Sequence, residues 1–590
     1  MPVERVPIAT KNKEMWPIKE LAVRLRIADD SFVSSQPCDK SDDNGGCHDD
    51  EPVRSRWSYE ESERTVQFRN SEKLDQLKSL RKNVDWTNEK KRHQFFQAFY
   101  LFVIRTWRGE IPDTTNLKSF WKRRDVQYFP HYVNDFLQKE LIDWLLLDCV
   151  EKRHRSDTHF HLSNVLISFV ASGAEYKDTP ELDENGQPLL LRTTALHRAA
   201  RIKHYCIVEV LFEIYNKFNV NYTDESGLSH FHVACMFGCV EVVEKFLRLG
   251  QDPNVIWQVT GDTPLHMALK NRHMQVSLLL LQWKANPNLV NNNGWTSVHI
   301  VCLGSQDNFE WLTMIRKESF QEYHPLRLSD SDKWGETPLH LALGRNLQVT
   351  AELLLRYGAD PNAIGANGST PLHIICKIVG EKLCEDKFLD LFFKIVVDDK
   401  NQRVNLDHWD VMSRTPLELA VAYHLPHAVQ LLLDRGADFS VFVFPDKIDL
   451  VNRFFGEPNE ILGYLRVASS YLVVIDILKT KGYRVLQHHA WKIKKVFEKT
   501  FKLAKFVENW YDDVEFVEEA GDIMITRCLS LYNLVRLHPK EAAILVKYRD
   551  YYNFMHSSMV LQWPSERYRD SCFLHLSQIM WEKFSVYGDP

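Results

Sequence analysis

The chain has 590 residues, of which 44% are hydrophobic and 26% are charged, so its composition excludes a fibrous or a wholly disordered protein. Its 79 acids outnumber its 73 lysines and arginines, and the net charge of −6 argues against nucleic-acid binding through a basic excess. The 11 cysteines include no Cys-x-x-Cys pair, which indicates a reducing compartment, the cytosol or the nucleus, and gives no support to a zinc ribbon.

The N-terminal part of the chain is expected to contain a disordered start and a helical cap. Residues 1–85 are predicted to be largely disordered, because residues 39–63 hold nine acids against three bases and few apolar anchors. From residue 86 onward, apolar side chains such as Phe95, Phe96 and Phe99 recur at helical spacing. Residues 86–190 are therefore predicted to form helices that cap the first repeat of the following array.

A four-residue pattern recurs through the middle of the chain. Its members are Thr194-Ala-Leu-His197, Ser229-His-Phe-His232, Thr263-Pro-Leu-His266, Thr296-Ser-Val-His299, Thr337-Pro-Leu-His340, Thr370-Pro-Leu-His373 and Thr415-Pro-Leu-Glu418. Their last residues are spaced by 35, 34, 33, 41, 33 and 45 positions. The pattern indicates about seven structural repeats, two of them with insertions.

The residue types of each unit predict a turn followed by two helices. A glycine such as Gly261 stands two residues before the threonine and suits a turn with positive φ. The threonine is expected to cap the first helix, and the proline fits its first turn. A second apolar helix then ends at a glycine, as in Gly358-Ala-Asp-Pro-Asn362.

These units resemble the ankyrin repeat over residues 191–443, in which Thr-Pro-Leu-His occurs three times in register. The resemblance implies an all-α ankyrin solenoid that binds other proteins. The end units depart from the pattern: Arg192 and Ser413 stand where the turn glycine belongs, and Glu418 replaces the histidine. Atypical end units are expected in a stacked array. Whether a degenerate eighth unit follows Phe439 is left open by the sequence.

The segment Tyr176–Pro188 is similar to the lead-in of a large insect-type ankyrin family, which often ends in a PRANC domain, the "pox proteins repeats of ankyrin C-terminal" module. Residues 444–484 are predicted to connect the array to this domain. Residues 485–590 are predicted to be the helical PRANC or F-box-like domain itself.

The C-terminal resemblance rests on a run that begins at Trp563 and Pro564 and is similar to the first helix of an F-box-like end. Trp563 stands where leucine is usual, and Phe573 and Leu576 fall where the apolar face of that helix belongs. The resemblance implies that these four residues engage the Skp-type adaptor of a cullin ubiquitin ligase.

No catalytic, cofactor or metal site is predicted, and the chain is expected not to be an enzyme. The histidines recur once per repeat, which is too far apart to share a metal ion. His232, Cys235 and Cys239 are suitable ligand types, but Gly238 interrupts the helix between the two cysteines. The longest apolar runs are far shorter than the ~20 residues of a membrane span. The six lysines of residues 492–505 are interpreted as the solvated face of an amphipathic helix.

Four tryptophans fall in the turns that precede the first helices of repeats: Trp257, Trp295, Trp334 and Trp409. Exposed at the tips of these turns, they would form a recognition surface, because tryptophan is enriched among binding hot spots. The alternative is that they fold back and pack against neighbouring turns. The sequence leaves both readings open.

The leading hypothesis is an adaptor whose repeats hold a protein target in the ankyrin groove while the C-terminal module recruits ubiquitin-ligase machinery. The alternative is a plain ankyrin scaffold or inhibitor whose C-terminal helices only cap the array. The two hypotheses differ in whether the apolar face of the helix that contains Phe573 and Leu576 is exposed or packed. The identity of the protein target cannot be read from the sequence, because surface residues vary freely on a fixed scaffold.

Overall fold

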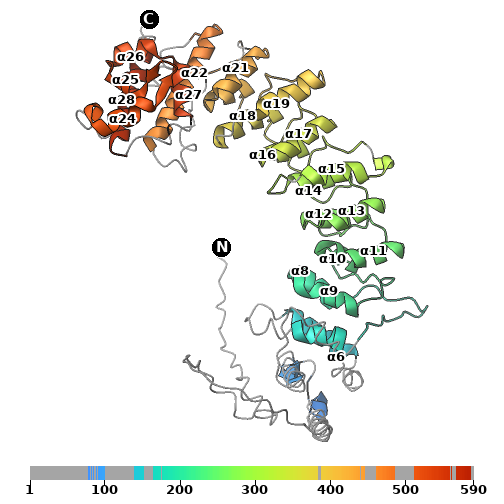
Figure 1. Ribbon diagram of the computed structural model, residues 1–590. Coiled ribbons are helices and arrows are strands. Elements are labelled where there is room, and N and C mark those ends of the chain that lie inside the picture. Colours follow the sequence, from blue (N-terminus) through green and yellow to red (C-terminus); the bar gives the residue numbers. More distant parts are fainter. Residues whose placement is uncertain are drawn as a thin grey trace, which may run out of the picture. The chain divides into compact units, whose positions relative to one another are not determined.

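The structure is a computed structural model (Figure 1). It describes residues 139–151, 164–173, 176–307, 309–323, 325–382, 387–438, 442–444, 460–484, 510–557 and 566–585, and single positions between 77 and 99 and at 440 and 560. The acidic start before residue 77 and the basic stretch 492–505 lie outside the described residues. The chain forms two compact units, residues 1–251 and 252–590.

The first unit joins the predicted cap region to two repeats. Its elements are α6 (Lys139–Glu151), the π-helical turn η3 (Phe169–Gly173), α8 (Ala195–Arg201), α9 (Tyr205–Ile214), α10 (His230–Phe237) and α11 (Val240–Arg248). Helix α6 packs against α8, and η3 packs against α9. Buried apolar side chains such as Leu145, Phe169 and Leu196 fill the space between these elements. The cap region and the first repeat therefore share one core.

Arg192, which occupies the expected place of a turn glycine, links the cap to the first repeat. Its guanidinium forms ion pairs with Asp143 of α6 and with Asp178, the latter at 3.0 Å. Tyr222 donates a hydrogen bond to Asp178 over 2.7 Å, and Arg192 lies over the Tyr222 ring. Burial raises the pKa of Asp143, although Arg192 acts in the opposite direction. This half-buried cluster holds α6 to the chain that enters α8.

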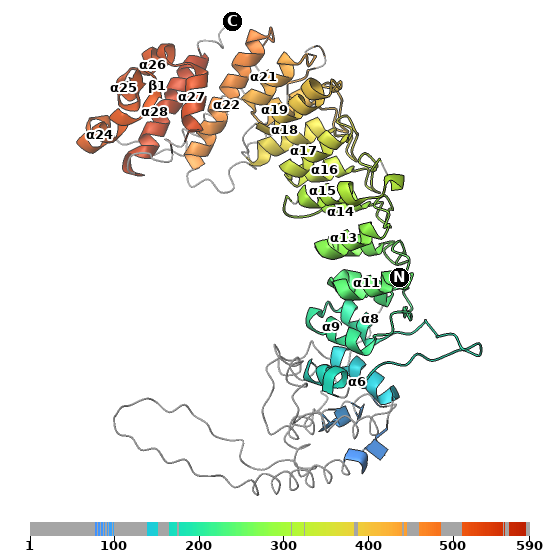
Figure 2. The ribbon, with the colours of Figure 1, turned by 45° about the vertical axis from the view of Figure 1, so that its right-hand side comes forward.

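The second unit begins with five further pairs of helices that follow one another as in a solenoid (Figures 1 and 2). The pairs are α12 (Pro264–Lys270) with α13 (Met274–Gln282), α14 (Ser297–Cys302) with α15 (Phe309–Glu318), α16 (Pro338–Gly344) with α17 (Gln348–Tyr357), α18 (Pro371–Lys382) with α19 (Lys387–Phe393), and α20 (Pro416–Ala422) with α21 (Pro426–Asp434). Successive first helices α12, α14, α16, α18 and α20 pack against one another. Their apolar faces, which include Leu265, Leu339 and Leu372, are buried between neighbours.

The repeated threonine and histidine fix the start of each first helix. In α12 the Thr263 hydroxyl accepts a hydrogen bond from the His266 backbone N–H, and the Thr263 N–H donates to His266 Nδ1 over 3.1 Å. Reciprocal capping of this kind satisfies backbone donors that a helix start leaves free. In His197, His340 and His373 the other ring nitrogen reaches a carbonyl of the next repeat, as in His340 Nε2 to the Ser369 carbonyl at 3.1 Å. These histidines are structural, as the sequence predicted.

The two insertions support the array locally. The first contributes Asp307, whose carboxylate accepts hydrogen bonds from the N–H groups of Val349 and Thr350 at the start of α17, and includes the 3₁₀ turn η4 (Gln321–Tyr323). The second contributes the π-helical turn η5 (Lys394–Asp399), which continues α19. Both insertions thus extend second helices or cap them, and neither interrupts the packing of the first helices.

A bundle of helices follows the array within the second unit. Its elements are α22 (Glu460–Thr480), the 3₁₀ turn η7 (Trp510–Asp512), α24 (Val514–Asp522), β1 (Met524–Thr526), β2 (Leu529–Ser530), α25 (Leu531–Arg536), α26 (Pro539–Leu545), α27 (Tyr548–Met555) and α28 (Glu566–Ser585). The strands β1 and β2 pair antiparallel. Within the described part of the chain, no helix combines the length and the apolar character that crossing a bilayer requires.

Helix α22 lies in the region that the sequence assigned to a connection, and it is a structural element of its own. It packs against α21, the last helix of the array, and also against α27 and α28. Phe442 and Phe444, just after the array, contact the ring of Tyr483. Because residues 460–480 form one long helix, this described stretch does not repeat the helix pair expected of an eighth unit.

Candidate functional site

The turns between repeats of the second unit form a row of fingers: residues 257–262, 291–295, 332–336, 365–369 and 409–414. A side chain closes most of these turns. Asp332 Oδ1 accepts hydrogen bonds from the N–H groups of Trp334 and Glu336, each at 2.9 Å. Asn291 and Asp410 make the same pair of bonds in their own fingers. An Asp or Asn that bonds its own turn in this way presets the backbone.

Neighbouring fingers are joined by main-chain hydrogen bonds. Asn292 N donates to the Thr260 carbonyl over 2.9 Å, Lys333 N to the Asn293 carbonyl over 2.9 Å, and Val411 N to the Asn367 carbonyl over 3.0 Å. Gly261 has φ +70°, and a Cβ on it would lie 2.5 Å from Asn292 N, so this position admits only glycine without displacement of the next finger. The finger tips are therefore held in fixed register.

Buried acids at the base of the fingers are neutralised by a cation of the first helix, Lys270, or of the finger itself, Arg414. Lys270 Nζ lies 2.7 Å from both carboxylate oxygens of Asp262, and Arg414 forms two hydrogen bonds with Asp410. Burial alone would raise the pKa of Asp262, but hydrogen bonds from Lys270 and Asn291 outweigh it and hold that pKa below its usual value. These carboxylates are ionised supports of the turns and are not free to bind a ligand.

The four turn tryptophans divide between the two predicted roles. Trp334 and Trp409 are each 55% exposed. Trp295 is half-buried, donates its indole N–H to Asp332 Oδ2 over 3.1 Å and packs against the Trp334 ring at a centroid distance of 5.6 Å. Trp257 is also half-buried, and its backbone pairs with Asp262. Trp334 and Trp409 thus belong to a surface, whereas Trp257 and Trp295 are parts of the fingers themselves.

Sequence reasoning missed two further exposed side chains on the last finger. Val411 and Met412 are 70% and 68% exposed, and they stand directly after the turn-closing Asp410. The sequence does contain a pattern that marks these turns. An Asp or Asn stands three residues before a Gly or Ser at positions 183, 224, 291, 332 and 410. The two residues after each of these positions are the finger tip. We call Trp334, Trp409, Val411 and Met412 the tip patch.

Two of the four C-terminal residues that were predicted to bind a partner, Phe573 and Leu576, are not available at a surface. Phe573 and Leu576 are fully buried in α28, which packs against α22, α25 and α26. The prediction that they supply exposed apolar surface is therefore wrong for this fold, because their helix face is turned toward the core of the bundle. Trp563 and Pro564 lie outside the described residues.

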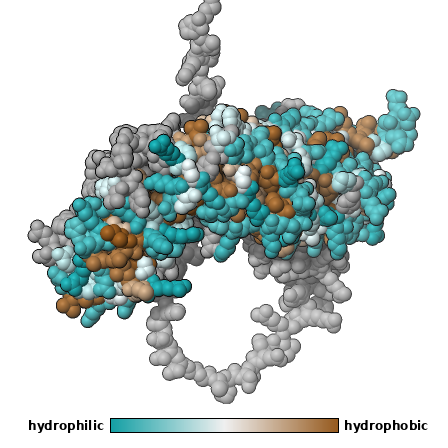
Figure 3. All heavy atoms as spheres, turned by 90° about the horizontal axis from the view of Figure 1, so that it is seen from above, coloured by the Kyte–Doolittle hydropathy of each residue, from teal (hydrophilic) through white to brown (hydrophobic). Residues whose placement is uncertain are grey.

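The bundle does carry apolar surface elsewhere. Seen from above, hydrophobic side chains gather at the left of the molecule, over the C-terminal helices (Figure 3). Ile544, at the end of α26, is 82% exposed, and Leu545 beside it is also exposed. Ile544 and Leu545 belong to α26, a different helix than the one that the sequence singled out.

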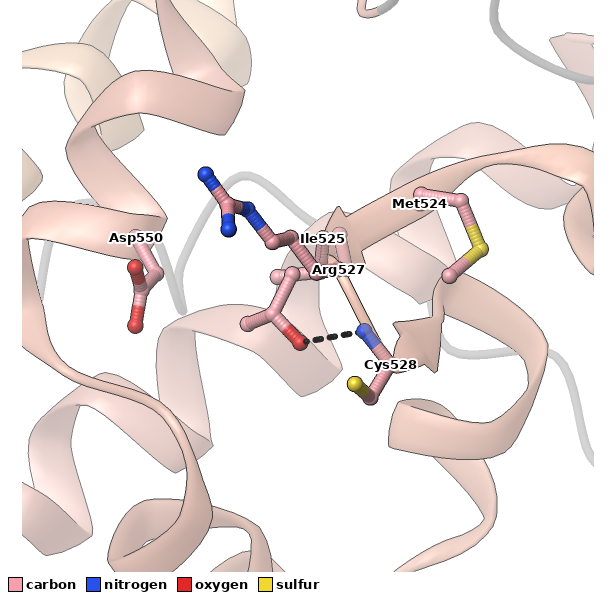
Figure 4. A pocket seen from close by; sticks show the side chains of 6 residues that line it. Met524, Ile525, Arg527, Cys528 and Asp550 are labelled. Carbon is pink, nitrogen blue, oxygen red and sulfur yellow. Dashed lines mark hydrogen bonds between the residues drawn. The ribbon is translucent and has the colours of Figure 1, made fainter.

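A shallow hollow of about 680 Å³ lies beside the β1–β2 hairpin and is lined by Met524, Ile525, Thr526, Arg527, Cys528 and Asp550 (Figure 4). Within this lining, Thr526 Oγ1 accepts a hydrogen bond from Cys528 N over 3.4 Å. Among the described residues that line the hollow, the charged side chains are Arg527 and Asp550.

The cysteines that resemble metal ligands are packed as neutral thiols. Cys235 is fully buried, and burial raises its pKa well above the usual range. Burial also raises the pKa of Cys239 to about 12. A thiol binds metal as the thiolate, which these pKa values disfavour. In the described residues there is no cluster of three or more His, Cys, Asp or Glu side chains suited to a metal ion.

Two family models, both described as ankyrin repeats, match residues 165–256 and 231–322 and residues 321–375. The two models place ankyrin repeats within residues 165–375, and the match begins inside the segment that the sequence assigned to the cap. The matched residues end before the C-terminal bundle, so the PRANC or F-box-like end is not supported by these family models.

Similar proteins share the repeats over part of their length. The human transient receptor potential cation channel subfamily A member 1 is 22% identical over 60% of this chain and 31% of its own length. Mouse rabankyrin-5 is 28% identical over 34% of this chain and 19% of its own. The chicken nuclear factor NF-kappa-B p105 subunit is 27% identical over 41% of this chain and 25% of its own. The chain spans less than a third of each of these relatives.

Among solved structures, the ankyrin repeat domain of Bcl-3, a member of the IkappaB protein family, aligns over its whole length with 43% of this chain at 23% identity and a TM-score of 0.33. The repeat assignment therefore rests on the family models and on the helix pairs and fingers described above.

Proposed function

We propose that this ankyrin-repeat chain is a non-enzymatic binding protein that holds a protein target through the tip patch of its second unit. The exposure of large apolar side chains on an ordered row of fingers carries this proposal. Trp334, Trp409, Val411 and Met412 lie on two fingers separated by one other finger, and hydrogen bonds fix the turns that carry them.

Trp409, Val411 and Met412 are largely exposed, and Trp334 remains 55% exposed beyond its contact with the Trp295 ring. The turns are closed by Asp332 and Asp410, which accept hydrogen bonds from the backbone N–H groups of Trp334 and Met412, and any tip residue except proline would allow these bonds. Large aromatic and sulfur-containing side chains left in water on a rigid support are typical of recognition surfaces. Because the finger tips are already ordered in the free chain, binding of a partner would cost little conformational entropy at the tips.

The adaptor hypothesis, in which the C-terminal bundle recruits a cullin-type ubiquitin ligase through a Skp-type adaptor, is weakened by the burial of Phe573 and Leu576. The packing of α22 against both α21 and the bundle favours the alternative, a scaffold or inhibitor whose C-terminal helices cap the array. Capping removes the exposed end that an open stack would present.

The test compares capture of cellular proteins by the full chain and by a Trp334→Ala, Trp409→Ala variant, followed by affinity measurements with the purified captured protein. We expect the variant to bind at least roughly 30-fold more weakly, because truncation of one hot-spot residue costs about 2 kcal/mol or more.

Trp283→Ala is the matched control, because Trp283 is an exposed tryptophan at the end of α13 and not on a finger. An equal loss of affinity in the Trp283→Ala control would show that the tip patch is not the binding surface. Undiminished binding of the captured protein by the tip variant would show the same. Recovery of a Skp-type adaptor with the full chain, and its loss with an Ile544→Ser variant, would instead support the adaptor hypothesis through α26.

A further inference from the structure

A hairpin in the first unit, residues 181–191, precedes the first repeat helix and was not recognised as a finger from the sequence. Leu182 and Pro188 form an antiparallel bridge, and Leu189 N donates to the Glu181 carbonyl over 2.8 Å. Asp183 Oδ1 closes the turn with hydrogen bonds from Asn185 N and Gln187 N, each at 2.8 Å. In Figure 2 the hairpin extends away from α6, α8 and α9 at the right of the view.

The base of the hairpin is fixed to the next finger. Thr223 N donates to the Leu190 carbonyl over 2.8 Å, and Arg192 N donates to the Thr223 carbonyl over 2.9 Å. Arg192 is itself held by Asp143 and Asp178. Order in this segment therefore comes from hydrogen bonds and ion pairs.

The apolar side chains of the hairpin are not used in the core. Leu182, Leu189, Leu190 and Leu191 are between 43% and 73% exposed. Four exposed leucines within ten residues form an unusual concentration of apolar surface on an ordered, protruding segment. Because these leucines are largely exposed, their packing does not hold the segment in place. Exposed apolar side chains on an ordered segment indicate a surface that binds a partner.

The same hairpin is acidic. Glu181, Asp183 and Glu184 are exposed, and residues 178–191 contain no lysine or arginine. Lys139 reaches Glu181 at 3.3 Å and offsets only one of these charges. The carboxylates would repel nucleic-acid phosphates and anionic lipid headgroups, and they would attract a cationic surface.

We propose that residues 181–191, the leucine hairpin, dock onto a protein surface in which apolar residues are bordered by lysine and arginine. The leucines enter the apolar part, and the carboxylates of Glu181 and Glu184 face its cationic border. This site lies in the first unit and does not depend on the tip patch of the second. An uncharged apolar groove would not match the acids, and a purely basic surface would leave the leucines in water.

The first experiment measures whether the hairpin is accessible in the full chain. Leu182→Cys and Leu191→Cys variants are labelled with a maleimide, and labelling is followed site by site with mass spectrometry, with the exposed Cys206 as internal reference. We expect both introduced thiols to react at rates close to that of Cys206. Strong protection would mean that another part of the chain covers the hairpin, and would overturn the proposal.

The second experiment measures binding of the full chain to three short helical peptides: one with a leucine stripe bordered by lysines, one with lysines and serines, and one with a leucine stripe bordered by glutamates. We expect preferential binding of the lysine–leucine peptide, weakened at high salt. A Leu182→Ser, Leu191→Ser pair and a Glu181→Gln, Glu184→Gln pair should each weaken it at least tenfold.

Leu249→Ser is the matched control, because Leu249 is a comparably exposed leucine at the end of α11 in the same unit. It should leave peptide binding unchanged. Equal binding of the lysine–serine peptide, or equal affinity in the hairpin variants and the wild type, would overturn the proposal. Self-association of the chain that the leucine pair abolishes would identify the occupant as a second copy and would also overturn it.

Discussion

Replacement of Leu339 by alanine is expected to lower the free energy of unfolding of the second unit by about 2–5 kcal/mol. Leu339 is fully buried on α16, which packs against α14, α17 and α18, so the truncation leaves a cavity between helices of three repeats. Because each repeat is stabilised by its neighbours, the loss should reach the flanking repeats as well. Urea denaturation followed by circular dichroism measures the shift of the unfolding midpoint.

Val349→Ala provides the comparison, since Val349 is an exposed residue of the adjacent helix α17. Its effect should stay within about 0.5 kcal/mol. An unfolding midpoint of the Leu339→Ala variant equal to that of the wild type would mean that Leu339 is not buried between stacked repeats, and that α16 packs in a different register.

Mild acid is expected to destabilise the repeats. Burial lowers the pKa of His197 and of His266 to about 4, and lowers the pKa of His299, His340 and His373 in the same direction. An unfolded histidine titrates near 6.5, so between about pH 6.5 and pH 4 the unfolded chain binds protons that the folded chain excludes. The stabilisation is therefore complete above about pH 6.5 and is lost as the pH falls toward 4.

The expected size follows from the two histidines whose pKa is about 4. At pH 5 each contributes a loss of roughly 2 kcal/mol relative to neutral pH, which is a large fraction of the stability of a typical domain. The pKa of Asp262 and of Asp410 is held below its usual value, so these carboxylates add acid sensitivity only below about pH 4. Denaturant titrations at a series of pH values separate the loss of stability caused by the histidines from the loss caused by the two carboxylates.

His266→Gln is the matched variant for this prediction. Gln at this helix position can accept the hydrogen bond of the Thr263 N–H without titrating, and Glu418 already does so with Thr415 N over 2.9 Å in the last repeat. The variant should fold at neutral pH and lose less stability between about pH 6.5 and pH 4. A free energy of unfolding of the wild type that stays constant between about pH 6.5 and pH 4 would contradict the lowered pKa of the buried histidines.

The repeat pattern predicted the helix pairs well, because Thr, Pro and Gly act through local geometry. Thr263 caps α12 and Gly261 closes its turn whatever lies farther along the chain. The length and packing of α22 were not predictable in this way. Its residues are apolar on more than one side, and only the presence of α21 on one face and α27 on another explains that pattern.

The candidate site was predictable in part. The tryptophans were correctly placed in the fingers, but nothing local distinguishes Trp295, which bonds Asp332, from the exposed Trp334 beside it. Likewise, an apolar helix face has the same sequence pattern whether it packs or docks. The burial of Phe573 depends on helices that are distant in sequence.

The construction of the fingers has a consequence for how binding specificity can change over evolution. The side chain of Asp332 or Asp410 and the residue that follows the tip set the shape of the turn, so the tip pairs Lys333-Trp334 and Val411-Met412 can be exchanged without disturbing the helices. The fingers that Asn291, Asp332 and Asp410 close thus each carry a short exchangeable pair of tip residues on the same turn geometry. New targets can be acquired one tip pair at a time, and the same property lets a designer transplant a tip pair from one repeat to another.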